Sequence, residues 1–155
     1  MQKRLVVPED EPFLFSVYAS TRKEEMAFWG WNEADKLAFL QMQYQMQLQS
    51  YERQYPNHVH QLILVEGAEV GRMMTAKTMD ALVLIDLSLL PVFRRQGIGT
   101  RLLQELQQEA TRSSQSVRLH VQSGNPASQL YKRLGFQELG EPSVYVEMEW
   151  TPRLE

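Results

Sequence analysis

The spacing of hydrophobic residues changes several times along the chain, and each change marks the boundary of a predicted element. Short apolar runs between turn residues predict strands, and apolar residues at three- and four-residue spacing predict helices. This pattern predicts an α/β protein. The strands are expected at residues 3–7, 59–66, 70–77, 81–89, 117–121, 136–139 and 144–150, and the helices at residues 11–20, 33–55, 98–112 and 125–134.

One segment fits two patterns. Glutamine alternates strictly with apolar residues over Gln41–Gln49, which locally resembles a strand. Over a longer window no turn signal interrupts the chain, and Gln, Met and Leu are good helix formers. We therefore predict one long helix that begins after Asn32 as its N-cap and ends before Pro56. Its apolar residues recur at helical spacing: Leu37, Leu40, Tyr44, Leu48, Tyr51 and Tyr55.

The pattern changes most abruptly after the apolar run Ala81–Leu90. Pro91 ends this run, two arginines and two glycines follow, and a helical pattern begins at Ile98. The first N–H groups of a helix have no partner within the helix, and the helix dipole makes that end positive. Glycine lets the backbone approach a bulky anion. The segment predicts a turn that binds a phosphorylated cofactor; the alternative is a flexible turn with two solvated arginines.

The positions of the glycines narrow the choice of cofactor. The chain has no Gly-Lys-Ser/Thr of a Walker loop, and Leu102 stands where a dinucleotide motif needs its third glycine. The pattern Arg-x-x-Gly-x-Gly from Arg94 to Gly99 resembles the pyrophosphate loop of the GNAT superfamily, the CoA-dependent N-acetyltransferases. The segment Asn125–Phe136 resembles the second signature of that family, in which Asn opens a short helix, Tyr lies near its end and Leu-Gly-Phe follows.

The resemblance covers residues 59–150 well, and it implies the family's mixed, twisted sheet with helices on both faces. It implies acetyl-CoA as the cosubstrate, with no metal. By position, the backbone of Leu87 and Leu89 would pair with the pantetheine arm. Asn125 and Ser128 would contact the same arm, although helix capping alone explains Asn125. Arg94 would add charge beside the pyrophosphate, the Thr100 side chain would donate one further hydrogen bond, and the Arg95 side chain would reach the 3′-phosphate of the nucleotide. The pyrophosphate itself would be held by the backbone amides of Arg95, Gln96, Gly97, Ile98, Gly99 and Thr100.

The resemblance also suggests which side chains move protons. Tyr131 is expected to protonate the departing CoA thiolate, since a tyrosine hydroxyl with its ordinary pKa near 10 suits an acid. The glutamate that some members carry as a base falls on Val83, so that base is absent. We hypothesise that Asp86, a charge in an apolar strand, orients His120 on the neighbouring strand as the base. A purely structural pair is the alternative.

The first helical segments are expected to contact the acceptor, opposite the cofactor. An aromatic and acidic wall would suit a cationic small-molecule amine or the amino group of a peptide or protein. Surface packing explains most of these residues equally well. The candidates are Glu24, Glu25, Trp29, Trp31, Gln43, Gln47 and Tyr51.

Length, charge and composition limit the number of domains, the partners and the location that we expect. The 155 residues predict one domain over 1–155, and a net charge of −3 gives no general attraction to nucleic acid. The chain has no cysteine, which excludes thiolate catalysis and fits a reducing, cytoplasmic location. No apolar run is long enough to cross a bilayer, so no membrane partner is expected. Pairing of the last strands between protomers would give a homodimer.

Two other classes of function stay open at this point. The chain could be a regulatory module that binds CoA and has lost turnover, for which the missing glutamate is the best argument. It could also be a protein-interaction module. Broad exposure of the helix over residues 41–55 would favour that second alternative. An acetyltransferase explains both signatures more economically than either of these modules. In such an enzyme the bound amine would attack the thioester directly, so no covalent enzyme intermediate would be needed.

Overall fold

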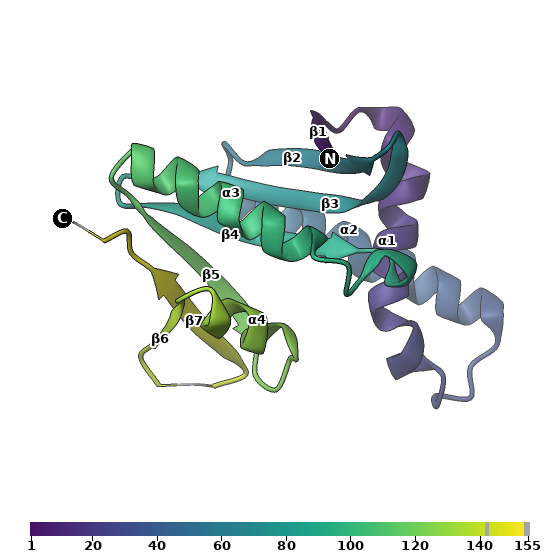
Figure 1. Cartoon of the computed structure of the whole chain (residues 1–155). Coiled ribbons are helices and arrows are strands. Elements are labelled where there is room, and N and C mark those ends of the chain that lie inside the picture. The colour runs from purple at the N-terminus through teal and green to yellow at the C-terminus, as the bar shows by residue number, and fades with distance from the viewer. Residues whose placement is uncertain (142, 154–155) are drawn as a thin grey trace. The chain divides into compact units, whose positions relative to one another are not determined.

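The computed structural model describes residues 1–141 and 143–153, and of Glu24 it describes the backbone alone. Seven strands hydrogen-bond in the order β1-β2-β3-β4-β5-β7-β6. The elements in chain order are β1 (Gln2–Leu5), α1 (Glu11–Met26), α2 (Glu33–Gln54), β2 (Val59–Val65), β3 (Ala68–Lys77), β4 (Ala81–Leu89), α3 (Ile98–Arg112), β5 (Ser116–Gln122), α4 (Ala127–Arg133), β6 (Gln137–Leu139) and β7 (Tyr145–Trp150) (Figure 1).

Contacts within the chain divide it into two compact units. The N-terminal unit comprises residues 1–74 and 86–93, and the C-terminal unit comprises residues 75–85 and 94–155. The strands β3 and β4 contribute residues to both units. We describe each unit by itself.

In the N-terminal unit, helices α1 and α2 pack on each other and on β2. Apolar residues at helical spacing make one face of each helix hydrophobic, and burial of these faces stabilises the unit. The rings of Tyr18 and Tyr44 lie 5.4 Å apart, centroid to centroid. Strand β1 pairs antiparallel with β2, from Gln2 opposite Leu64 to Leu5 opposite Gln61. The buried cluster consists of Leu14, Tyr18, Met26, Leu40, Tyr44 and Leu62.

In the C-terminal unit, α3 packs on β5 with an apolar face. Strands β4 and β5 run parallel, from Ala81 opposite Ser116 to Leu84 opposite Leu119, which confirms the predicted neighbours. Strand β7 pairs antiparallel with both β5 and β6. Parallel and antiparallel pairs in one sheet confirm the predicted mixed α/β class. The buried residues of α3 are Ile98, Leu102, Leu103, Leu106 and Ala110.

The element boundaries are close to the predicted ones, with α1 as the main correction. The prediction ends this helix at Ser20, but the helix continues to Met26, which is buried. Residues 21–26 are mostly charged and look like a loop, yet Lys23 and Glu25 are exposed while Met26 is buried, as on a continuing helix that packs one face. The N-cap of α2 is confirmed, since Asn32 Oδ1 accepts from Asp35 N at 2.8 Å.

The chain's first turn depends on a buried carboxylate. The Arg4 guanidinium donates to both oxygens of Asp10, at 2.8 and 2.9 Å, and the Val7 amide donates to Oδ2 at 2.8 Å. The hydrogen bond from Arg4, followed by the one from Val7, lowers the pKa of Asp10 to about 2. Both donors favour the ionised carboxylate.

This ion pair predicts acid sensitivity. The folded-state pKa of Asp10 lies below its ordinary value of 3.8, so its stabilisation is present above pH 3.8 and is lost as the pH falls toward 2. We expect Asp10→Asn to lower the free energy of unfolding at neutral pH and to flatten its decline over that pH range. Urea unfolding at a series of pH values measures this. Glu9→Gln, a change at an exposed neighbour, should leave the decline as it is in the wild type.

Candidate active site

The turn before α3 has the backbone that a phosphate site needs. Arg95 and Gly97 have positive φ, +62° and +82°, and Gly97 is the N-cap of α3 with no side-chain cap. The first helical bond runs from Arg101 N to Gly97 O at 3.0 Å. The amides of residues 98–100 therefore precede the hydrogen-bonded part of the helix. No acidic residue lies in this first turn, so an anion would meet the positive end of the helix dipole.

Gly99 leaves this end of the helix open. A Cβ at position 99 would meet only Leu130 Cδ2, at 3.8 Å, which is an ordinary van der Waals contact. The fold would therefore accept a side chain there, and glycine weakens a helix by about 1 kcal/mol relative to alanine. The close approach to Leu130 also shows that the start of α3 lies against α4, which carries the second signature.

Helix α4 holds Tyr131 firmly. The Tyr131 ring packs edge-to-face on Phe136, with 5.8 Å between centroids, and the Phe136 amide donates to Tyr131 O at 3.0 Å. Gly135 has φ of +95° and turns the chain into β6, so the Leu-Gly-Phe triplet works as a helix end. Asn125 Oδ1 accepts from the Ala127 amide at 2.9 Å, so Asn125 caps α4, while Ser128 is half-buried on the helix.

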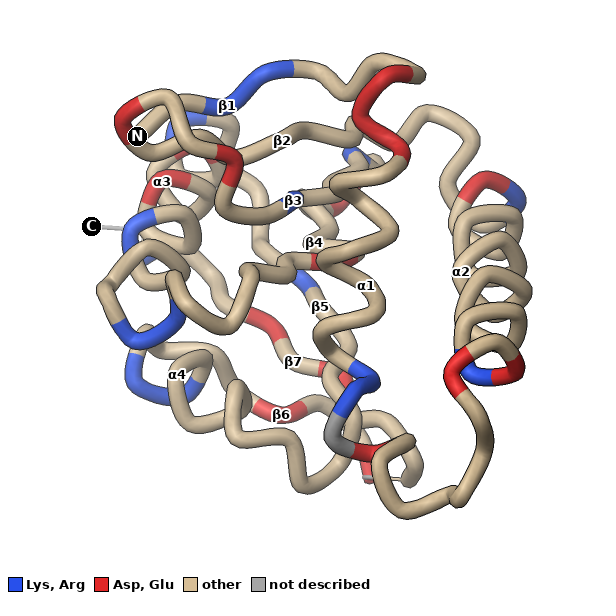
Figure 2. Tube along the Cα trace, turned by 90° about the vertical axis from the view of Figure 1, so that its right-hand side faces the viewer, with Lys and Arg blue, Asp and Glu red and all other residues tan. Residues whose placement is uncertain are grey.

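Positive charge collects on these elements of the C-terminal unit. Figure 2 shows a Lys and Arg segment on α4, which contains Lys132 and Arg133. Arg94 and Arg95 are exposed in the turn before α3. A polyanionic nucleotide would therefore meet both backbone donors and cationic side chains.

In the N-terminal unit, the strands β3 and β4 approach each other closely beside the predicted pantetheine strand. A Cβ at Gly71 would lie 2.2 Å from the Ser88 carbonyl oxygen, so only glycine fits there. The Leu90 amide donates to Val70 O at 2.9 Å and continues the pairing. Leu87 and Leu89 lie in this part of β4 and are partly buried.

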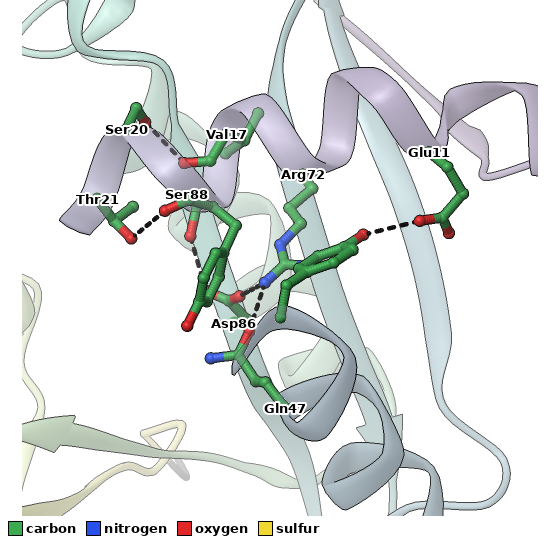
Figure 3. A network of polar contacts seen from close by, with 10 residues as sticks. Glu11, Val17, Ser20, Thr21, Gln47, Arg72, Asp86 and Ser88 are labelled. Carbon is green, nitrogen blue, oxygen red and sulfur yellow. Dashed lines mark hydrogen bonds and ion pairs between the residues drawn. The ribbon is translucent and has the colours of Figure 1, made fainter. Parts of the chain in front are cut away.

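A buried arginine organises the polar groups of the N-terminal unit (Figure 3). Arg72 on β3 is 1% exposed, and its NH2 nitrogen donates to Asp86 Oδ2 at 2.5 Å and to Gln47 Oε1 at 3.0 Å. Its guanidinium lies 5.8 Å from the centroid of the Tyr44 ring. Ser88 Oγ donates to the second oxygen of Asp86 at 2.9 Å. The network thus links α2, β3 and β4.

This network corrects the hypothesis about Asp86. Among the described residues, the partner of its carboxylate is Arg72, with Ser88, rather than the predicted His120. The His120 Nε2 atom lies 3.8 Å from Glu147 Oε2 on β7, and both side chains are well exposed. Arg72 is the functional candidate that sequence reasoning missed.

Besides two nitrogens of Arg72, one ring nitrogen of His60 is buried without a partner among the described residues. The Nε and NH1 atoms of Arg72 and the Nε2 atom of His60 are buried and have no hydrogen-bond partner within the described part of the chain. Burial, followed by the charge of Arg72, lowers the pKa of His60 to about 4, so His60 is neutral at neutral pH. Burial is also the main cause that raises the pKa of Tyr44 to about 12. These two side chains are neutral parts of the polar interior.

The acceptor candidates of the N-terminal unit form two groups. Trp29 and Trp31 stack edge-to-face on each other, with 5.2 Å between centroids, and on Phe39, at 5.6 and 5.3 Å. Both indoles are exposed, to 40% and 43%. Gln43 and Gln47 face inward, where Gln43 accepts from the Tyr18 hydroxyl at 3.4 Å and Gln47 from Arg72. These two groups belong to the loop after α1 and to the inner face of α2.

The remaining candidates are less defined. Tyr51 is half-buried, and Glu25 lies 3.8 Å from Arg22 on the exposed side of α1. The side chain of Glu24 is outside the described residues. No three His, Cys, Asp or Glu residues of the described chain come together as a metal site. Over the same residues, no helix is both long and apolar enough to span a membrane.

Several solved structures of N-acetyltransferases have a similar fold. The PaiA N-acetyltransferase of Thermoplasma acidophilum, solved with coenzyme A, is 18% identical, with a TM-score of 0.72 over 97% of this chain and 98% of that one. The ribosomal-protein-S18-alanine N-acetyltransferase of Escherichia coli is 18% identical, with a TM-score of 0.65 over 99% and 95%. An aminoglycoside 6'-N-acetyltransferase with coenzyme A is 15% identical, with a TM-score of 0.64 over both whole chains.

The family follows from a sequence comparison. The model for the acetyltransferase (GNAT) domain matches residues 21–152, which is most of the chain. A search of curated protein sequences finds no match. The chain therefore belongs to the GNAT acetyltransferase family, as its two signatures predict.

Proposed function

We propose that this chain transfers an acetyl group from acetyl-CoA to an amine by direct attack within a ternary complex. The observation that carries the proposal is the contact between Gly99 and Leu130, which places the open N-terminus of α3 beside the helix of Tyr131. Donors for a pyrophosphate and a hydroxyl for proton transfer are thus joined in one unit. The chain has no cysteine to form an acyl-enzyme.

Each part of the C-terminal unit has a role in this proposal. The amides of residues 98–100 and of the turn at residues 95–97 bind the pyrophosphate, and the side chains of Arg94 and Thr100 add donors. Acetyl-CoA supplies the thioester that the amine attacks, and CoA leaves as a thiolate. Tyr131 donates its phenolic proton to that sulfur. In the N-terminal unit, the backbone of Leu87 and Leu89 would bind the pantetheine arm.

The base and the acceptor site are assigned to residues of both units. The His120 side chain is exposed, so its imidazole would accept the proton of the amine directly or through water. Asp86 is proposed to contact the acceptor while Arg72 and Ser88 hold it. Trp29, Trp31, Glu25 and the inward glutamines would suit a cationic acceptor, either a small amine or a peptide amino group. We keep one domain over residues 1–155 and a cytoplasmic location as predictions.

The experiment that tests the proposal is calorimetric titration with acetyl-CoA. We expect wild type to bind, and Gly99→Glu to weaken binding at least about 100-fold, because the new carboxylate occupies the phosphate position and repels it. A Cβ at this position makes only an ordinary contact with Leu130, and circular dichroism checks that the variant is folded.

The matched control is Gly67→Glu in the turn between β2 and β3. It introduces the same charge at a glycine with φ of +80° and no atom within 4 Å, so it strains the backbone without touching the phosphate turn. Equal affinity for Gly99→Glu and wild type, or no binding by folded wild type, would contradict the proposed function.

A further inference from the structure

The outer face of α2 has an unusual composition for a solvent-exposed helix. No Asp, Glu, Lys, Arg or His occurs over residues 37–51, and Figure 2 shows the middle of α2 without charge between its charged ends. Met42 and Met46 are 52% and 59% exposed. The rest of this outer face is exposed as well and is uncharged: Ala38, Gln41, Gln45, Gln49 and Ser50.

The alternation of Gln and apolar residues is therefore divided between two faces. Tyr44 and Leu40 are buried, and Gln43 and Gln47 have partners inside the N-terminal unit. The outer glutamines and methionines are left for solvent. By contrast, the exposed residues of α3 include Arg101, Gln104 and Arg112, which give that helix an ordinary solvated face. Exposed apolar side chains in a contiguous patch are typical of an interaction site.

The charges at the two ends of α2 suggest what covers this face. Asp35 lies in the first turn and Arg53 in the last, and both are exposed. They are 53 − 35 = 18 residues apart, which is about five turns of an α-helix, so they lie on the same side of it. Met42 and Met46 lie symmetrically between them. A second α2 in antiparallel orientation would place Arg53 opposite Asp35 and Met46 opposite Met42, at both ends alike.

We propose that the outer face of α2 binds the outer face of α2 in a second copy of this chain, with the two helices antiparallel. The amide groups of Gln41, Gln45 and Gln49 each donate and accept, so they are complementary to themselves across a two-fold axis. The absence of charge in the middle removes like-charge repulsion from the pairing. A contact one helix wide buries an area at the low end of stable interfaces, so we expect a micromolar Kd.

Sedimentation velocity over the micromolar range tests the pairing. Wild type should change from monomer to dimer as its concentration rises, and Met46→Glu should stay monomeric because it places two carboxylates near the axis. Gln108→Glu, the same charge on the exposed side of α3, should dimerise like wild type. A monomeric wild type, or dimerisation of Met46→Glu equal to that of wild type, would overturn the proposal. Circular dichroism confirms that each variant is folded.

Cysteine cross-linking tests the orientation, because the chain has no cysteine of its own. Position 45 lies close to the expected two-fold axis between the two α2 helices. The variant Gln45→Cys should therefore form a disulfide-linked dimer rapidly under mild oxidation. Gln108→Cys, an exposed helical glutamine elsewhere, should cross-link only slowly. Equal rates for the two variants would exclude an α2 interface. Binding of acetyl-CoA is not involved in either readout, so these outcomes are independent of the proposed function.

Discussion

Tyr131→Phe is expected to lower kcat about 100-fold and to leave the affinity for acetyl-CoA unchanged. The variant removes only the hydroxyl, and its ring can keep the edge-to-face packing on Phe136. Without the hydroxyl, the thiolate must leave unprotonated or take a proton from water. A free-thiol assay with an excess of amine acceptor measures kcat, and calorimetry measures the affinity.

Tyr145→Phe is the control for this variant, since Tyr145 is an exposed tyrosine on β7. It should leave kcat within about twofold of wild type. If Tyr131→Phe had the same kcat as wild type and bound acetyl-CoA normally, Tyr131 would have no part in proton transfer. If wild type itself bound acetyl-CoA but acetylated no amine of a broad panel, the regulatory module would be the better description.

Arg72→Met is expected to destabilise the fold by about 3–5 kcal/mol, because removing one partner of a buried ion pair leaves the other without compensation. Arg72 is 1% exposed, and its loss deprives both Asp86 and Gln47 of a hydrogen bond. Urea unfolding, with an unchanged slope against urea concentration, measures the change in free energy.

Two variants make this prediction specific. Arg118→Met removes an ion pair that is largely solvated, with Glu149 at 2.6 Å, and should cost less than about 1 kcal/mol. The double variant Arg72→Met with Asp86→Leu should recover much of the loss, since no unpaired charge remains. Equal effects of Arg72→Met and Arg118→Met would show that burial adds nothing to the Arg72 pair.

Most of the fold could be predicted because the hydrophobic period changes clearly at the element boundaries. The predicted ranges of β4 and α3 agree with the structure, since a proline and two glycines separate an apolar run from an amphipathic one. The end of α1 could not be predicted in the same way. Its last turn is charged, and only the buried Met26 marks it as helical.

The backbone of the candidate site was predictable, and the pairing of side chains across strands was less so. The turn and the start of the helix at Ile98 follow from Gly97 and Gly99 before an amphipathic pattern; binding of a phosphate by this turn stays a prediction. The partner of Asp86 was assigned to β5 because a neighbouring strand offered a histidine. A signal for the true partner was present: Arg72 is a charge in an apolar strand of the hairpin that contains Asp86. Strands that follow each other in the chain are usually neighbours, whereas β4 and β5 are separated by a helix, which favours Arg72 on β3 over His120 on β5 as the partner of Asp86.

The close approach of β3 and β4 at Gly71 has a consequence for directed evolution of acceptor preference. Any side chain at position 71 would push the Ser88 carbonyl oxygen away. It would thereby disturb the hydrogen bond from Ser88 Oγ to Asp86. A mutant library gains nothing from diversity at this position. Among the proposed acceptor residues, Tyr51 is partly buried and Trp29 and Trp31 are exposed, so we expect substitutions there to disturb the fold less, and a search for new specificities would begin with them.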